Sequence, residues 1–168
     1  MRPARRALLL AAASMPLVLA GCGFELRKAP HFAFHSIFLA LPSGSPFQAE
    51  LQRQLQSTGS VEVLTDPQQR SKADVILESP GPVRSQVIVS RTSTGDISEL
   101  ELHLRLGFRV VTPAGKEVLG QTSIEREIDQ SYSASEALSK ALEAELLYNN
   151  MQSDIVQQVM RRLATVKL

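Results

Sequence analysis

The sequence of 168 residues has one cysteine, no tryptophan and three histidines. A single cysteine cannot form a disulfide within the chain or supply the paired thiolates of a structural zinc site. His31 and His35 flank one predicted strand and His103 lies within another, so no histidine pair lies on a helix. The sequence also lacks a Gly-x-Ser-x-Gly elbow and a glycine-rich loop between a strand and a helix. These absences argue against a hydrolase, a nucleotide-binding enzyme and a resident metal site.

The N-terminus has the pattern of a secretory signal. Three arginines within the first six residues precede an apolar stretch at 7–20 that is too short to span a bilayer as a mature helix. It ends in Leu-Ala-Gly-Cys at 19–22, which resembles the bacterial lipobox, where the cysteine is acylated and the peptide is cut just before it. We therefore expect a signal peptide at 1–21 and a Cys22 that carries an N-terminal acyl chain and an S-diacylglycerol group, with no other cofactor. An ordinary signal followed by a free thiol is the alternative.

The charge of the expected mature chain is close to balanced. Without the three signal arginines, 15 Lys and Arg face 17 Asp and Glu, a formal net charge of −2. Binders of nucleic acid carry a basic field over a whole face, so this balance argues against a nucleic-acid partner. An anionic ligand would have to be met by local cations.

Hydrophobic periodicity predicts a single α+β domain at 33–168, after a short lipidated leader at 22–32. Strand patterning, helical patterning and turn residues give the order β-α-β-β-β-β-α. We expect a two-layer sandwich, with a mixed or antiparallel sheet of four to five strands and two helices packed on one face. Strand patterning covers 34–41, 74–79, 83–90, 97–110 and 118–129, a short extended piece covers 61–64, and helical patterning covers 46–58 and about 133–163.

Strict alternation in the segment 97–110 predicts an antiparallel strand with one buried and one wet face. The apolar side carries Leu100, Leu102, Leu104, Leu106, Phe108 and Val110, and the polar side carries Glu99, Glu101, His103, Arg105 and Arg109. In the next strand, Ile124 and Ile128 point inward and Glu125, Glu127 and Asp129 point outward. Exposed carboxylates keep ordinary acidity, so we interpret these groups and His103 as a solvated face and predict no enzyme.

Spacings of three and four predict a long C-terminal helix, capped by Ser133 or Ser135. Its apolar stripe comprises Ala141, Ala144, Tyr148, Met151, Ile155, Val159 and Leu163. Arg161 and Arg162 near its end are interpreted as partners of the helix dipole.

Several stretches together resemble one family, the lipopolysaccharide-assembly lipoproteins LptE. "CGFELR" at 22–27 looks like the mature start of that family, with Gly23, an aromatic residue, and then Leu26 and Arg27. The resemblance continues in order through "FQAELQRQLQSTGSVEV", "SELELHLRLGFRVVTPAGKEVL" and "ALEAELLYNNMQSDIVQQVMRRL", and so covers the whole mature chain. The lipobox alone is shared by many lipoproteins, and the combination is what points to this family.

The resemblance implies a partner, a ligand and a location. The partner is the outer-membrane β-barrel LptD, in which the domain forms a plug as a 1:1 heterodimer, and the ligand is lipopolysaccharide. The chain would be lipid-anchored in the outer membrane of a Gram-negative cell, on the periplasmic side and in the barrel lumen. By resemblance to other lipoproteins, Gly23 after the lipidated cysteine also implies sorting to the outer membrane. The alternatives are a purely structural assembly factor for a barrel, without lipid binding, and an unrecognised envelope enzyme.

Two cations are implied as lipopolysaccharide contacts. Alignment of flanking residues places the family's basic contacts on Arg91, in "VSRTSTG", and Lys140, in "ALSKALEAE". Arginine grips a phosphate through two parallel hydrogen bonds, and lysine acts as a point charge, so both suit phosphates of lipid A or of the core. The alternative is that each is an ordinary solvated cation.

Overall fold

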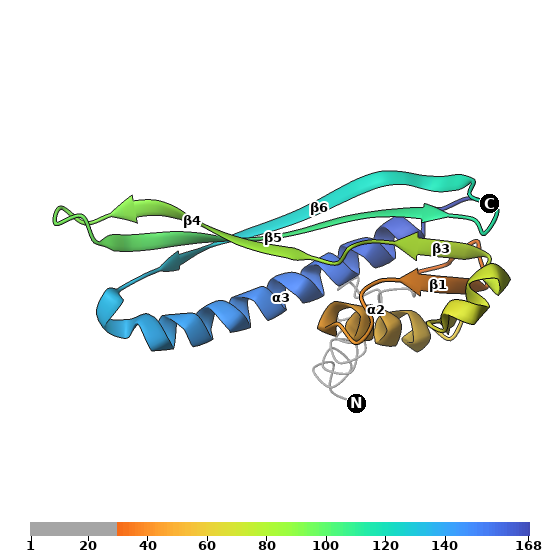
Figure 1. Ribbon diagram of the computed structural model, residues 1–168, viewed down its shortest axis with the longest axis horizontal. Coiled ribbons are helices and arrows are strands. Elements are labelled where there is room, and N and C mark those ends of the chain that lie inside the picture. The colour runs from red at the N-terminus through yellow and green to blue at the C-terminus, as the bar shows by residue number, and fades with distance from the viewer. Residues whose placement is uncertain (1–29) are drawn as a thin grey trace, which may run out of the picture.

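The computed structural model describes residues 30–168, which form an elongated molecule with a sheet on one side and helices on the other (Figure 1). The predicted signal peptide, Cys22 and most of the leader lie outside these residues. The α+β two-layer prediction is confirmed. The elements are β1 (Ser36–Ala40), α2 (Pro46–Ser57), β2 (Glu62–Leu64), the 3-10 helix η2 (Pro67–Lys72), β3 (Val75–Glu78), β4 (Val83–Arg91), β5 (Ile97–Val111), β6 (Glu117–Ser131), the 3-10 helix η3 (Ala134–Glu136) and α3 (Ala137–Leu163).

The sheet is mixed and has six strands in the described residues, so the expected count of four to five was too low. The strand order is β2-β1-β3-β5-β4, and β6 pairs with the other edge of β5. The additional strand is β2, three residues long, which pairs with β1 in parallel. A stretch this short carries too little periodicity to separate a strand from an extended loop.

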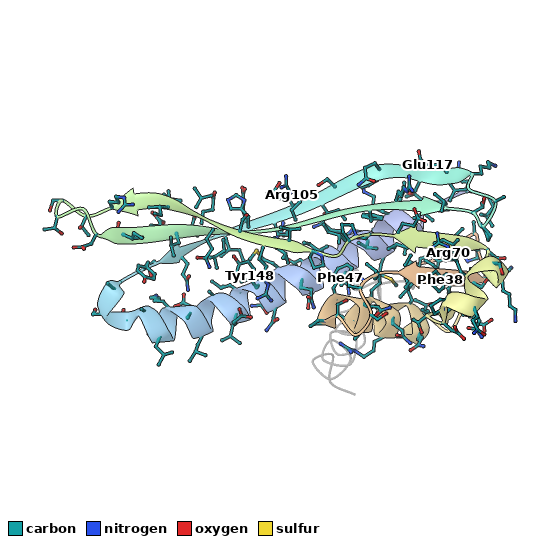
Figure 2. All side chains as sticks on the ribbon, in the orientation of Figure 1. Phe38, Phe47, Arg70, Arg105, Glu117 and Tyr148 are labelled. Carbon is teal, nitrogen blue, oxygen red and sulfur yellow. The ribbon has the colours of Figure 1, made fainter. Side chains whose placement is uncertain are left out.

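The long strand β5 has the two faces that its alternation predicts. It is antiparallel to β3, β4 and β6. The inward residues from Leu102 to Val110 are buried in the main core, together with Ile124 of β6. Figure 2 shows Tyr148 and Phe47 between the sheet and the helices, whereas Arg105 projects from the opposite side. The main core is therefore an apolar layer between one face of the sheet and the helices.

The first helix begins as predicted. Ser45 accepts a hydrogen bond at its side chain from the backbone N–H of Gln48, and Pro46 occupies the first turn of α2. The chain then returns to the sheet after Gly59, which takes a φ of 66° that suits glycine.

The start of the second helix differs from the prediction. The residues after Ser133 form the short η3, and α3 begins at Ala137 without a side-chain cap. Ala141 is exposed, although the spacing placed it in the buried stripe, whereas Ala144 and the later members are buried as expected. Periodicity predicts only which way a side chain points around the helix axis. The side chain is buried only if the sheet also lies close to that turn of the helix.

One end of the wet face is covered, which the sequence did not predict. The 3-10 helix η2, in a segment for which no helix was predicted, lies over a second small core that contains Phe38, and Arg70 stacks 5.8 Å from the ring centroid of Phe38. Arg109 and Arg70 both bind the Glu78 carboxylate and hold the pKa of Glu78 below its ordinary value. Asp66, whose side chain accepts from the N–H of Gln68, and the following proline were the available signal of a helical start.

Candidate functional site

The candidate site lies at the end of the molecule that carries both the β4–β5 turn and the start of α3 (Figure 1). Arg91 is the last residue of β4, and its Nη1 donates a 2.9 Å hydrogen bond to the carbonyl of Gly95 in that turn. Arg91 is exposed and forms no ion pair with any residue of 30–168. Most of its guanidinium donors are therefore free to bind an anion.

Lys140, in the first turn of α3, has a different environment. Its Nζ donates to Ser131 Oγ at 3.0 Å and to Glu143 Oε2 at 2.9 Å, and its side chain is only 17% exposed. The buried Gln130 donates to the carbonyl of Lys140 at 2.8 Å. Lys140 thus joins β6 to α3, and an anionic ligand would have to share its ammonium with Glu143.

The structure brings the two predicted cations to one end of the molecule, on different elements. Before Arg91, β4 exposes the apolar side chains of Val87, Ile88 and Val89. The site therefore offers a cation next to apolar surface, which suits an anionic group attached to a hydrocarbon.

A clamp on Tyr148 holds β4 against α3. The Arg84 guanidinium lies 4.6 Å from the ring centroid of Tyr148, and Arg84 Nη1 also binds the Glu145 carboxylate at 2.8 Å. The hydroxyl of Tyr148 donates to the carbonyl of Ser85 at 2.9 Å. Because β4 is an edge strand whose side chains are almost all exposed, these contacts fix the strand that carries Arg91.

Tyr148→Phe is expected to lower the free energy of unfolding by about 0.5–1.5 kcal/mol, because it removes one hydrogen bond and keeps the buried ring. Urea unfolding followed by circular dichroism measures this loss. Tyr132→Phe is the control, because no hydrogen bond of its hydroxyl occurs within 30–168, and it should leave stability unchanged. Equal effects of the two substitutions would contradict the proposed role of the clamp.

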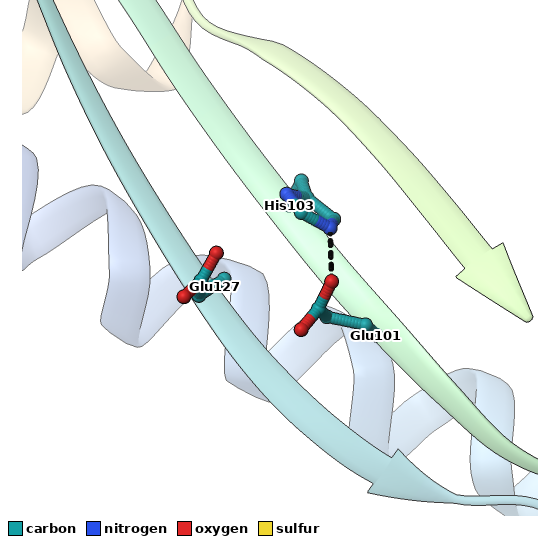
Figure 3. Close-up of side chains that lie close together, drawn as sticks. All are labelled: Glu101, His103 and Glu127. Atoms are coloured by element: carbon teal, nitrogen blue, oxygen red, sulfur yellow. Dashed lines mark hydrogen bonds and ion pairs between the residues drawn. The ribbon is translucent and has the colours of Figure 1, made fainter. Parts of the chain in front are cut away.

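The wet face of β5 and β6 carries a cluster around His103 (Figure 3). His103 Nε2 lies 2.7 Å from Glu101 Oε1, and its Nδ1 lies 3.3 Å from Glu125 Oε1. Ligand atoms of Glu101, His103 and Glu127 lie within 4.8 Å of one another, a spacing that a metal ion could bridge. The carboxylates of Glu101 and then Glu125, which accept hydrogen bonds from the imidazole, raise the pKa of His103 above its ordinary 6.5. The contacts of His103 with these two carboxylates therefore form an ion-pair network on the wet face.

His103→Gln is expected to destabilise the protein at about pH 5 and to matter less at about pH 9. The pKa of His103 is raised in the folded state, so its protonation stabilises the fold fully at any pH below the unfolded pKa of 6.5. This stabilisation is lost as the pH rises through the pKa of the folded state. Thermal melting of both proteins across this range measures the difference. A gap between their melting temperatures that is independent of pH would contradict a protonated His103.

The sequence analysis missed an exposed apolar stripe on α3. Leu138, Leu142 and Leu146 stand four residues apart and are 64–79% exposed. Further along α3, the side chains of Gln152 and Ser153 both donate to Glu50 of α2, and Val156 and Met160 are buried. The leucine spacing itself was the available signal.

In the described residues, no helix is both long enough and apolar enough to cross a membrane.

Comparison with known proteins identifies the family. The family LptE, described as "Lipopolysaccharide-assembly", matches residues 34–163. The chain belongs to the LptE family. LPS-assembly lipoproteins LptE are similar to it at 28% identity in Photorhabdus laumondii and at 30% in Yersinia pestis. The alignments cover 89% of this chain in both cases, and 81% and 72% of the respective relatives.

A solved structure supports the same fold. The solution structure of an uncharacterised lipoprotein B from Nitrosomonas europaea is 26% identical and superposes with a TM-score of 0.70, covering 84% of this chain and 90% of that one. LptE is a non-enzymatic family of lipopolysaccharide-assembly lipoproteins, which confirms the prediction that this chain is not an enzyme. Membership in LptE gives the chain a role in lipopolysaccharide assembly.

Proposed function

We propose that this LptE chain is anchored in the outer membrane through Cys22, forms a plug in the LptD barrel, and binds lipopolysaccharide on its way to the outer leaflet. The observation that carries the binding proposal is the exposed Arg91 at the end of an apolar edge strand. Lipopolysaccharide combines phosphates with acyl chains, so it presents the anionic and apolar groups that this site would contact. Lys140 would add a second charge once a phosphate competes with Glu143.

Two features support the partner. The outward face of β5 and β6 is polar, as suits the lumen of a large barrel. The leucine stripe on α3 and the apolar side chains of β4 give exposed surface that a permanent partner would cover.

Isolation of the complex tests the partner. A tagged chain, extracted from outer membranes with mild detergent, should co-purify with LptD in equal amounts and carry lipopolysaccharide. Recovery of the chain without any β-barrel would contradict the proposal.

A second candidate function is a structural assembly factor that binds the barrel and no lipid. Lys140 favours it, because its ammonium already binds Ser131 and Glu143. Recovery of LptD without measurable lipopolysaccharide binding by the isolated chain would select this function.

The anchor gives a separate prediction. With residues 1–21 replaced by an ordinary secretory signal, Cys22→Ser is expected to move the chain from the membrane to the soluble periplasmic fraction. Its melting temperature should stay unchanged, because the buried apolar core of the described residues lies between Phe32 and Val166. Fractionation, mass spectrometry and thermal melting check the result. A wild-type chain whose Cys22 mass shows no lipid would contradict the anchor and select the free-thiol alternative.

A further inference from the structure

A shallow pocket of about 250 Å³ lies between β6 and the C-terminal half of α3, away from the end that carries Arg91. Its lining combines two guanidinium groups, two side-chain amides and one carboxylate. These belong to Arg126, Asp154, Gln157, Gln158 and Arg161.

The fold brings these side chains together from two elements. Arg126 pairs with Leu104 in the β5–β6 ladder, and so shares the sheet face that points to α3. On α3, spacings of three and four place the other lining residues on one side of the helix. Arg126 Nη2 donates to Asp154 Oδ2 at 3.0 Å, which orients the guanidinium and leaves its remaining N–H groups available.

The local charge is positive although the expected mature chain is negative. Asp154 is the last acidic residue of the sequence, and Arg161, Arg162 and Lys167 follow it. Within 30–168, Arg161 forms no ion pair. The lining therefore carries two arginines against one carboxylate that already binds Arg126. Arg161 lies in the last turn of α3, where its charge interacts favourably with the helix dipole. That interaction uses none of its guanidinium N–H groups, so these can bind a ligand.

We propose that this pocket binds a phosphate group. Two arginines present planar forks that match phosphate oxygens, and the amides of Gln157 and Gln158 add neutral donors. The phosphate could belong to lipopolysaccharide, in which case the inference rests on the proposed function and adds a contact separate from Arg91 and Lys140. It could also be free inorganic phosphate, which offers the same oxygens.

The test uses the mature lipidated chain, labelled with nitrogen-15, in a non-ionic detergent. Inorganic phosphate, titrated at constant ionic strength, should shift the side-chain N–H signals of Arg126, Arg161, Gln157 and Gln158 in a saturable way. Arg126→Gln combined with Arg161→Gln should weaken this binding at least about tenfold. Asp154→Asn should tighten it, because it removes the one negative charge that the residues of 30–168 contribute to the lining.

The matched control is Arg53→Gln combined with Arg70→Gln. Arg70 binds Glu78 as Arg126 binds Asp154, and Arg53, like Arg161, has no ion pair within 30–168, so the control changes the charge equally. It should leave phosphate binding unchanged. No saturable shift in the wild type, or equal loss in control and test variants, would overturn the proposal.

Binding of intact and dephosphorylated lipopolysaccharide to the same proteins separates the two sources of phosphate. Weaker binding of intact lipopolysaccharide to the Arg126 and Arg161 variant, with no change for the dephosphorylated form, would assign the pocket to the lipid. Unchanged lipopolysaccharide binding, with phosphate binding lost, would assign it to free phosphate. If lipopolysaccharide binds the wild type and phosphate gives no shifts, the pocket proposal fails and the proposed function stands. If phosphate gives the shifts and lipopolysaccharide does not bind, the pocket proposal stands and lipopolysaccharide binding in the proposed function fails.

Discussion

Leu106→Asp is expected to unfold the domain. Leu106 is fully buried in the main core, directly opposite Ile124 of β6. Removing a buried leucine side chain costs about 2–5 kcal/mol, and a buried carboxylate without a partner costs several more. The sum is comparable to the whole stability of a typical domain, about 5–15 kcal/mol. Far-UV circular dichroism and urea unfolding should show a protein that is unfolded or close to it.

Leu104→Asp provides a graded comparison on the same face of β5. Leu104 is equally buried, but its neighbours across the ladders are Arg84 in β4 and Arg126 in β6. These arginines can donate to the new carboxylate, so the loss of stability should be smaller than for Leu106→Asp. A Leu106→Asp protein that melts like the wild type would show that the faces of β5 are assigned the wrong way round.

Arg91→Asp combined with Lys140→Gln is expected to reduce lipopolysaccharide affinity at least tenfold, since each lost charge-assisted hydrogen bond costs about 1.5–3 kcal/mol. Glutamine is chosen at position 140 because an aspartate there would lie beside Glu143, which the lysine now neutralises. The melting temperature should fall by only a few degrees, through the lost contacts of Lys140 to Ser131 and Glu143. Direct titration with lipopolysaccharide measures the affinity.

Arg53→Asp combined with Lys72→Gln is the matched control. Both residues are exposed, and neither forms an ion pair within the described chain. The control changes the net charge equally and should bind lipopolysaccharide as the wild type does. If both pairs weaken binding equally, attraction is diffuse and Arg91 and Lys140 do not form the site.

Strong periodicity made the strands and helices predictable. The alternation of β5 predicted both of its faces, and the helical patterning that begins at residue 46 matches the start of α2. The short β2 and the helix η2 were missed, because three to six residues carry almost no periodic signal. Whether a residue of α3 such as Ala141 is buried depends on where the sheet lies, and that follows from the tertiary structure.

The candidate site was predictable only in part. Flanking residues matched to the family pointed to Arg91 and Lys140, and the structure brings both to one end of the molecule. The partners of Lys140 come from β6 and from its own helix, so only the packing of α3 on the sheet reveals how engaged this lysine is. Residues that converge from β6 and α3, such as Arg126 and Arg161, are likewise neighbours only in the folded chain.

Depletion of this chain in the bacterium that makes it tests its role in lipopolysaccharide assembly most directly. Newly made lipopolysaccharide, pulse-labelled and probed at the surface of intact cells, should stop reaching the outer leaflet and accumulate inside the envelope. Re-expression of the wild-type chain should restore delivery, and the Arg91→Asp and Lys140→Gln variant should restore it less well. Delivery at an unchanged rate after the chain has been depleted would contradict the account.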